Sequence, residues 1–256
     1  MSGSNRLRAI HLANIGAFLL TVIVNALANV LPLGGNTTAE VSDAYPTLFA
    51  PAGYVFSIWG IIYTLQLVFV VYQALPKQRE NLFVKKVGFL FVLSSLANVI
   101  WLFLWHYEHI ALSVLPMFTL LGTLIAVYLR LQIGQSKVSL REKLCVHVPF
   151  SVYLGWITVA SIANVAAALK AVNWDGFGLG DATWTVLMII AALIITLAVT
   201  LTRKDIAYSL VIVWALVGII IKQIEQPNIV ITAGIGVIVI VTALVTSALA
   251  FRKEKS

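Results

Sequence analysis

Three apolar segments of the sequence each place tryptophan beside an amide or a phenol at helical spacing. The three sets are Trp59, Tyr63 and Gln66; Asn98, Trp101 and Trp105; and Trp156, Ala160 and Asn164. Residues three, four, seven or eight apart lie along one side of an α-helix, so each set forms a stripe. Indole and amide groups are costly to leave facing lipid tails, and the stripes should therefore face one another. An aromatic-walled cavity with a few amides suits recognition of a flat, mostly apolar molecule.

The same segments carry none of the constellations that catalysis requires. They contain no paired carboxylates, nucleophile triad or metal cluster, so we assign no catalytic residue and no metal ligand. The nearest approach to a metal site is the polar turn His106-Tyr107-Glu108-His109, where two histidines at i and i+3 could share an ion with Glu108. A solvated turn at the membrane interface is the simpler interpretation. The sequence thus favours a binding protein over an enzyme.

The composition places these segments in a membrane. The 256-residue chain is 61% hydrophobic and 11% charged, with a mean hydropathy of +0.98, whereas a soluble domain carries about 25% charged residues. This predicts an all-α integral membrane protein with the lipid bilayer as its first partner. The single Cys145 excludes an internal disulfide. The pI near 9.6 does not indicate nucleic acid, because the basic residues gather at helix ends.

Eight stretches are long and apolar enough to be transmembrane helices, since a span needs about 20 mostly apolar residues. They cover residues 9–31, 54–75, 83–105, 109–131, 145–168, 183–202, 206–222 and 229–250. The segment from Pro32 to Gly53, rich in Gly, Thr, Pro and acidic residues, is expected to be a loop. A cleaved signal peptide is the alternative for the first stretch, because Ala26-Leu27-Ala28 has a small-x-small form. Asn25 and Asn29 instead favour a retained span with an inward-facing polar pair.

Basic residues separate between the two ends of these spans. One end collects 15 of the 17 Lys and Arg residues, and the other keeps only Lys170 and Lys222. Positively charged loops stay on the cytoplasmic side, so both termini are expected in the cytoplasm, with a bacterial cell membrane as the expected location. If one span were miscounted, the basic residues would no longer fall on one side of the membrane, so their distribution supports eight spans.

A segment rich in proline and aromatic residues opens the second stretch, and it reads PTLFAPAGYVFSIWGIIY over residues 46–63. Prolines suit the start of a helix but disrupt its interior. Here the chain resembles the translocator protein family, also called the tryptophan-rich sensory protein (TspO/MBR) family. In that family a Pro-Pro-x-Trp-Val-Phe-Gly-Pro-Val-Trp-x-x-Leu-Tyr segment opens the second helix. The chain departs from it because Ala52 replaces the second Pro, Tyr54 replaces the first Trp, and Ser57 stands where Gly-Pro would be.

Two further segments match the family in order. Residues 96–101, LANVIW, resemble its third-helix Leu-Asn-x-x-Trp stretch, and residues 153–164, YLGWITVASIAN, resemble its fifth-helix Tyr-Leu-Ala-Trp…Leu-Asn pattern. The acidic residue that the family often carries early in its fourth helix is absent, with Val114 or Leu115 in its place. The resemblance covers residues 1 to about 170, a five-helix bundle, and leaves three additional transmembrane helices in residues 171–256.

The resemblance implies a function and a site. The family binds flat hydrophobic molecules, notably porphyrins, and sterols in its animal members, in a pocket between the helices beneath the long first loop. By position, the pocket would be formed or supported by Pro51, Tyr54, Trp59, Tyr63, Asn98, Trp101, Tyr153, Trp156 and Asn164. The resemblance implies transport, sequestration or sensing of a porphyrin or haem-related ligand, with no required cofactor. It leaves open both a homodimer and an enzymatic activity, since family members dimerise and indole-assisted porphyrin breakdown has been proposed within the family.

Other functions stay open on the sequence alone. A secondary transporter or channel for another small solute would fit eight spans divided four and four, although no internal repeat is visible and ionisable residues are missing from the span centres. A scaffold whose last three helices dock a partner subunit is a third interpretation. The Trp and Asn residues could also simply pack helices together, which needs no ligand. Near the end of the chain, Lys222 lies three residues before Glu225, which predicts a local ion pair.

Overall fold

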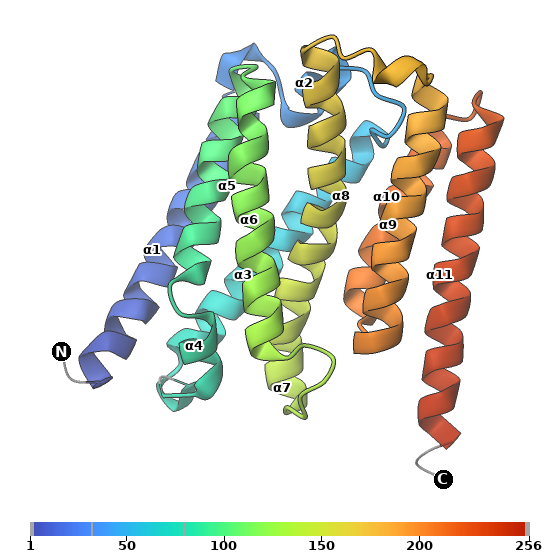
Figure 1. Ribbon diagram of the computed structural model, residues 1–256. Helices are drawn as coiled ribbons and strands as arrows, with labels where there is room; N and C mark the ends of the chain where they lie inside the picture. The colour runs from blue at the N-terminus through green and yellow to red at the C-terminus, as the bar shows by residue number, and fades with distance from the viewer. Residues whose placement is uncertain (1–2, 32, 79, 254–256) are drawn as a thin grey trace.

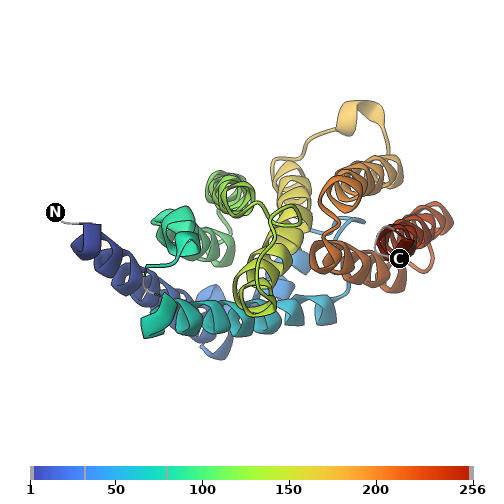
Figure 2. The same cartoon turned by 90° about the horizontal axis from the view of Figure 1, so that it is seen from below.

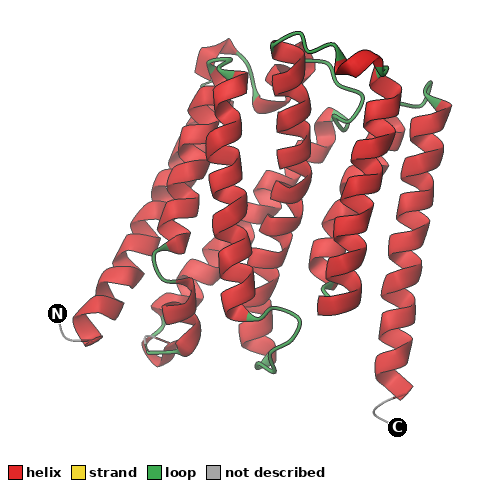
Figure 3. Cartoon of the chain, in the orientation of Figure 1, coloured by secondary structure: helices red, strands yellow, loops and turns green. Residues whose placement is uncertain are grey.

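The computed structural model describes residues 3–31, 33–78 and 80–253, and the regular elements within these ranges are all helices (Figure 3). The long helices are α1 (Gly3–Val30), α3 (Ile58–Ala74), α5 (Leu90–His106), α6 (Ile110–Leu131), α8 (Val148–Ala171), α9 (Asp181–Arg203), α10 (Ile206–Lys222) and α11 (Pro227–Lys253). The short ones are α2 (Thr38–Ala44), α4 (Leu82–Val87) and α7 (Leu140–Glu142). Short turns of other helical types cover η1 (Leu33–Gly35), η2 (Gly53–Ser57), η3 (Pro76–Gln78), η4 (Lys143–His147) and η5 (Gly176–Gly178). The predicted all-helical class is confirmed.

Helix α8 is the centre of the molecule and packs against α6, α3 and α10. In Figure 1, α1, α5 and α6 lie on one side of α8, while α9, α10 and α11 lie on the other, and α3 crosses obliquely behind. Helix α8 is apolar on nearly every face, which is typical of a helix that is buried all round. Gly155 permits the close contact with α10, because a Cβ at this position would lie 3.0 Å from the Tyr208 carbonyl oxygen.

Six helical segments of the described chain are long and apolar enough to cross a membrane. They are Asn5–Ala28, Gly53–Ala74, Ile110–Leu131, Leu140–Ala171, Asp181–Arg203 and Pro227–Leu249. Two further apolar helices, α5 and α10, have 17 residues each and fall below the usual length of a span. The chain is therefore a multi-pass membrane protein, and both described ends lie at the same end of the helices (Figure 1).

The third predicted span, residues 83–105, is wrong as a single helix. Helix α4 ends at Val87, and the chain turns at Gly88, where φ is +51°, before α5 begins at Leu90. Glycine adopts this left-handed region without the steric cost that a side chain imposes, so Gly88 ends α4. The apolar residues on either side made the two helices look continuous in the sequence.

The segment between the first two long helices contains no span among its described residues, as expected, but it is more ordered than a plain loop. Its helix α2 begins with a capping box, in which the Thr37 hydroxyl accepts from the Glu40 amide at 3.3 Å and the Glu40 carboxylate accepts from the Thr37 amide at 2.7 Å. These hydrogen bonds lower the pKa of Glu40, which lies in water outside the helices of the bundle. We refer to residues 33–57, with 33–35, α2 and η2 as its helical parts, as the lid segment.

Candidate ligand-binding site

Trp59 on α3 stands at the centre of a cluster of aromatic rings. Its indole stacks on Tyr63 at 5.6 Å between ring centroids and on Trp101 of α5 at 6.0 Å. From α8, Tyr153 and Trp156 meet the same indole edge-on at 6.1 and 6.2 Å. Three helices that are far apart in the sequence thus present their stripes to one another, and offset stacking and edge contacts are the geometries that aromatic rings prefer.

A chain of buried hydrogen bonds fixes the polar groups around this cluster. Trp101 donates from Nε1 to Asn164 Oδ1 at 2.8 Å, and Asn164 donates from Nδ2 to Ser113 Oγ at 2.8 Å. On the other side, Asn25 of α1 donates to Asn98 Oδ1 at 2.9 Å. These bonds join α1 to α5 and α5 through α8 to α6, so the amides predicted to line a pocket also hold the helices in place. The side chain of Asn29, the expected partner of Asn25 on the same face, lies outside the described residues.

Other polar atoms of the cluster are buried without being satisfied. Trp156 Nε1 has no hydrogen-bond partner among the described residues. The Tyr63 hydroxyl and Asn98 Nδ2 lie near each other, yet neither reaches hydrogen-bond geometry. An unmet donor in an apolar interior costs about 1–3 kcal/mol, so such groups need an explanation. Of these residues, Trp156 lines the small cavity described below.

The lid segment closes the cluster from the end opposite the termini. The Trp105 indole donates to the Thr38 carbonyl oxygen at 3.1 Å, and Phe56 meets Trp156 edge-on at 5.8 Å. Behind Phe56, the Ala52 amide donates to the Gly218 carbonyl oxygen at 3.1 Å, which ties η2 to α10.

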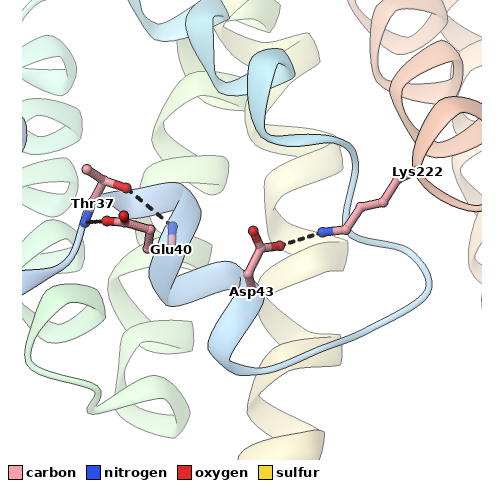
Figure 4. A network of polar contacts seen from close by, with 4 residues as sticks. All are labelled: Thr37, Glu40, Asp43 and Lys222. Atoms are coloured by element: carbon pink, nitrogen blue, oxygen red, sulfur yellow. Dashed lines mark hydrogen bonds and ion pairs between the residues drawn. The ribbon is translucent and has the colours of Figure 1, made fainter.

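An ion pair adds a second tie between the lid segment and α10. Figure 4 shows Lys222 reaching from the end of α10 to Asp43 on α2, with 2.5 Å between Nζ and Oδ1. The predicted local pair of Lys222 with Glu225 is therefore wrong, since the long lysine side chain turns towards the lid segment instead. Helix α10, one of the three additional helices, thus takes part in closing the site.

A small cavity remains between the cluster and the lid segment. Its volume is about 30 Å³. Its walls are Thr38, Ser42, Pro51, Phe56, Trp59, Trp101, Trp105, Trp156, Val159, Ala160, Ala163 and Asn164. Space of this size holds no more than a few water molecules, whereas ligand pockets usually measure about 300–1,000 Å³. The rings pack against one another and fill most of the space between α3, α5 and α8.

The structure brings together most of the residues predicted for the site. Those that meet in the cluster are Trp59, Tyr63, Asn98, Trp101, Tyr153, Trp156 and Asn164, and Pro51 lines the cavity above them. Tyr54 lies elsewhere, because its ring is exposed and packs edge-on against Trp214 of α10 at 5.3 Å. The turn η2 sends Phe56, not Tyr54, towards Trp156.

Sequence reasoning missed several residues that shape the site. Thr38 accepts a hydrogen bond from Trp105, and Ser113 accepts one from Asn164. No spacing in the sequence indicates either contact. Asp205 was also missed, although it lies at the opposite end of α10 from the lid segment and does not shape the site. It begins α10 as a buried N-cap and accepts hydrogen bonds from the Tyr128 hydroxyl at 2.9 Å and from Ser151 Oγ at 2.6 Å. An aspartate directly after a basic pair and before an apolar run was the available sign of such a cap.

The polar turn after α5 does not gather a metal site in the part of the chain that the structure describes. His106 is buried instead, with Nδ1 2.9 Å from the Leu102 carbonyl oxygen and Nε2 3.4 Å from the Thr38 hydroxyl. Glu108 accepts a hydrogen bond from the Tyr45 hydroxyl at 3.0 Å. The turn thus contacts the lid segment at Thr38 and Tyr45.

Comparison with known proteins gives one match. A search of curated proteins and a search of solved structures each find nothing similar. The family model described as TSPO-like protein matches residues 11–246, which extends beyond residue 170 to include α9, α10 and most of α11. Since that match covers far more than half of the chain and agrees with the aromatic stripes that meet on α3, α5 and α8, the chain belongs to the TSPO-like protein family.

Proposed function

We propose that this protein binds a planar hydrophobic molecule of porphyrin-like or sterol-like shape at the aromatic cluster beneath the lid segment. The observation that carries the proposal is the unpaired Trp156 Nε1 in the wall of a cavity that aromatic rings surround. Indole and phenol rings offer flat surfaces for a macrocycle or a ring system, and the donors suit acceptor atoms at its edge.

Binding requires the lid segment to move. The 30 Å³ cavity of the closed state is far smaller than a tetrapyrrole, so the ligand would displace Phe56 and the rings that now fill the site. Polar contacts hold the lid segment to α5 and the turn after it (Trp105 and His106 with Thr38, Glu108 with Tyr45) and to α10 (Gly218 with Ala52, Trp214 with Val55, and the Asp43–Lys222 pair). We expect opening to begin at the exposed Asp43–Lys222 pair, because such a pair contributes only about 0–1 kcal/mol.

The arrangement in the membrane is part of the same proposal. We infer that α5 and α10 also cross the bilayer, giving eight spans, with a five-helix bundle ending near residue 170 and three additional helices. On the distribution of basic residues, both termini would face the cytoplasm of a bacterial cell and the lid segment would face outward. A ligand taken up under that lid could be transported, sequestered or sensed.

The test is titration of the purified protein with protoporphyrin IX, and in parallel with a sterol, followed by the absorbance or fluorescence of the ligand. Trp156→Phe keeps the ring and removes only the N–H donor, so we expect binding to weaken by about 2- to 10-fold. Phe89→Leu, at an exposed ring outside the cluster and outside both cavities, is the control and should bind as the unaltered protein does. No saturable binding of either ligand, or equal affinity in both variants, would overturn the proposal.

A further inference from the structure

A second cavity lies on the opposite face of α8 from the lidded cluster. It measures about 430 Å³ and lies between α6, α8 and α9, with residues 174–179 and also Thr47 and Leu48 of the lid segment in its wall. Figure 2 shows α6 and α9 on either side of α8. This volume falls within the range of ligand pockets, about 300–1,000 Å³, in the structure as it stands. The cavity is therefore preformed, unlike the cluster under the lid segment.

The walls of this cavity are apolar. Its main side chains are Phe118 and Leu121 of α6, Ile162 and Val165 of α8, and Met188 and Ile195 of α9. The hydroxyls of Thr158 and Ser161 also lie in the wall, but they donate to the Leu154 and Ile157 carbonyl oxygens of their own helix at 2.9 and 2.7 Å. The interior thus suits a hydrocarbon chain.

The length of the cavity matches one leaflet of a bilayer. On α9 its lining runs from Asp181 to Ile195, and at 1.5 Å per residue this corresponds to about 21 Å. Half of the hydrocarbon core of a bilayer is about 15 Å thick. The cavity therefore begins at headgroup level, at the end opposite the termini, and ends just past the middle of the membrane.

The mouth of the cavity carries charges of both signs. Lys170 pairs with Asp181 at 2.6 Å, with side chains that are 40% and 56% exposed, and Asp175 adds a second carboxylate. Trp184 donates to the Gly176 carbonyl oxygen at 2.9 Å and lies 5.1 Å from the ring of Trp174. Tryptophan at this level is typical of the boundary between headgroups and tails.

From these features we propose that the cavity binds one membrane phospholipid with an ammonium–phosphate headgroup of the ethanolamine type. One acyl chain lies in the cavity between α6 and α9. The phosphate contacts Lys170, and the primary ammonium group donates to the carboxylates of Asp181 and Asp175. The mouth's single cation and two carboxylates would repel a purely anionic headgroup, and a choline group has no N–H to donate.

The test is native mass spectrometry of the detergent-purified protein after incubation with an equimolar mixture of phosphatidylethanolamine, phosphatidylcholine and phosphatidylglycerol. We expect the protein to retain one phosphatidylethanolamine at about tenfold higher occupancy than either other lipid, because hydrogen bonds to charged groups are the stronger ones. Lys170→Gln should remove that preference. Lys137→Gln, which removes an exposed lysine at the opposite end of the bundle, should leave it unchanged.

A second variant tests the apolar part of the cavity. Ala166 lines the cavity, and Ala166→Phe should block retention of all three lipids, with an unchanged circular dichroism spectrum as the control for folding. Equal retention of the three lipids, retention of none, or a preference that survives Lys170→Gln would each overturn the proposal. Detection of protein dimers in place of lipid adducts would also overturn it, since a second copy of the chain would then occupy the cavity. Porphyrin binding is measured in a separate titration, so a negative result with lipids does not contradict the proposed site beneath the lid segment.

Discussion

Asn164 is the residue on which the aromatic cluster depends most directly. It accepts from Trp101 and donates to Ser113, and it is almost completely buried. Asn164→Leu keeps a similar volume but leaves Trp101 Nε1 without an acceptor and removes the bond to Ser113, whose hydroxyl still donates to the Ile110 carbonyl oxygen at 2.7 Å. We expect it to lower the free energy of unfolding by about 2–4 kcal/mol, measured by thermal or denaturant unfolding in detergent.

A double-mutant cycle separates this hydrogen bond from packing. Trp101→Phe removes the donor, and the double variant Trp101→Phe/Asn164→Leu should be less destabilised than the sum of the two single variants. Strict additivity of the two effects would show that the bond between these side chains contributes nothing.

Asp205 plays the same part at the other end of the molecule. Its carboxylate accepts from Tyr128 and Ser151 and caps α10 through the Tyr208 amide at 3.2 Å. Asp205→Ala leaves two buried hydroxyls without an acceptor and removes the cap, so we expect a loss of about 2–4 kcal/mol. Glu225 is an exposed acidic residue in the turn between α10 and α11. Glu225→Ala should change the free energy of unfolding by less than about 0.5 kcal/mol in the same assay. Equal effects of the two substitutions would contradict the role given to Asp205.

At the scale of elements, the close contact between η2 and α10 fixes the position of the lid segment. A Cβ at Gly218 would lie 2.2 Å from Val55 Cγ2 and 3.1 Å from Pro51 Cβ, and the Gly218 carbonyl oxygen accepts from Ala52. Gly218→Val therefore cannot keep this contact and should push η2 away from α10. We expect faster hydrogen exchange at the amides of residues 50–57, with α8 unchanged.

Gly122 provides the matched control for this experiment. It also lies inside a long helix, but a Cβ there would meet nothing within 4 Å. Gly122→Val should leave exchange in residues 50–57 as it is in the unaltered protein. If Gly218→Val gave the same result, the lid segment would be held by something other than its fit against α10.

At the scale of the whole molecule, the helices must alternate in direction across the bilayer. With Cys145→Ser as background, single cysteines at Lys137 and at Gln226 probe opposite ends of the bundle. We expect a membrane-impermeant maleimide to label Gln226→Cys in intact cells and Lys137→Cys only after the cells are opened, because basic loops stay inside. Labelling of both positions from outside, or the reverse pattern, would overturn the proposed orientation.

Much of the fold could be predicted from the sequence, because membrane helices record their presence in runs of apolar residues. The break at Gly88 was missed for the same reason, since apolar residues on both sides hid a local change in backbone direction. Positions on one helix were also predictable, and the stripes of Trp59, Trp101 and Trp156 meet as their spacing indicates.

Contacts between distant elements were not predictable in the same way. Tyr54 turns to Trp214, and Lys222 reaches Asp43 and not Glu225, over separations of more than 150 residues in each case. The resemblance placed Tyr54 beneath the lid, but the chain differs from the family pattern at that point and η2 takes another path.

The sequence by itself determined that this is an all-helical membrane protein and that aromatic stripes face one another on α3, α5 and α8. These properties follow from local periodicity and from the cost of exposing polar groups to lipid. Only the tertiary structure decided that the cluster is closed and nearly filled, that α10 holds the lid segment, and that the open cavity lies between α6, α8 and α9. Cavities and ties of this kind arise from how whole helices pack, and the spacing of residues along one helix carries no information about its neighbours.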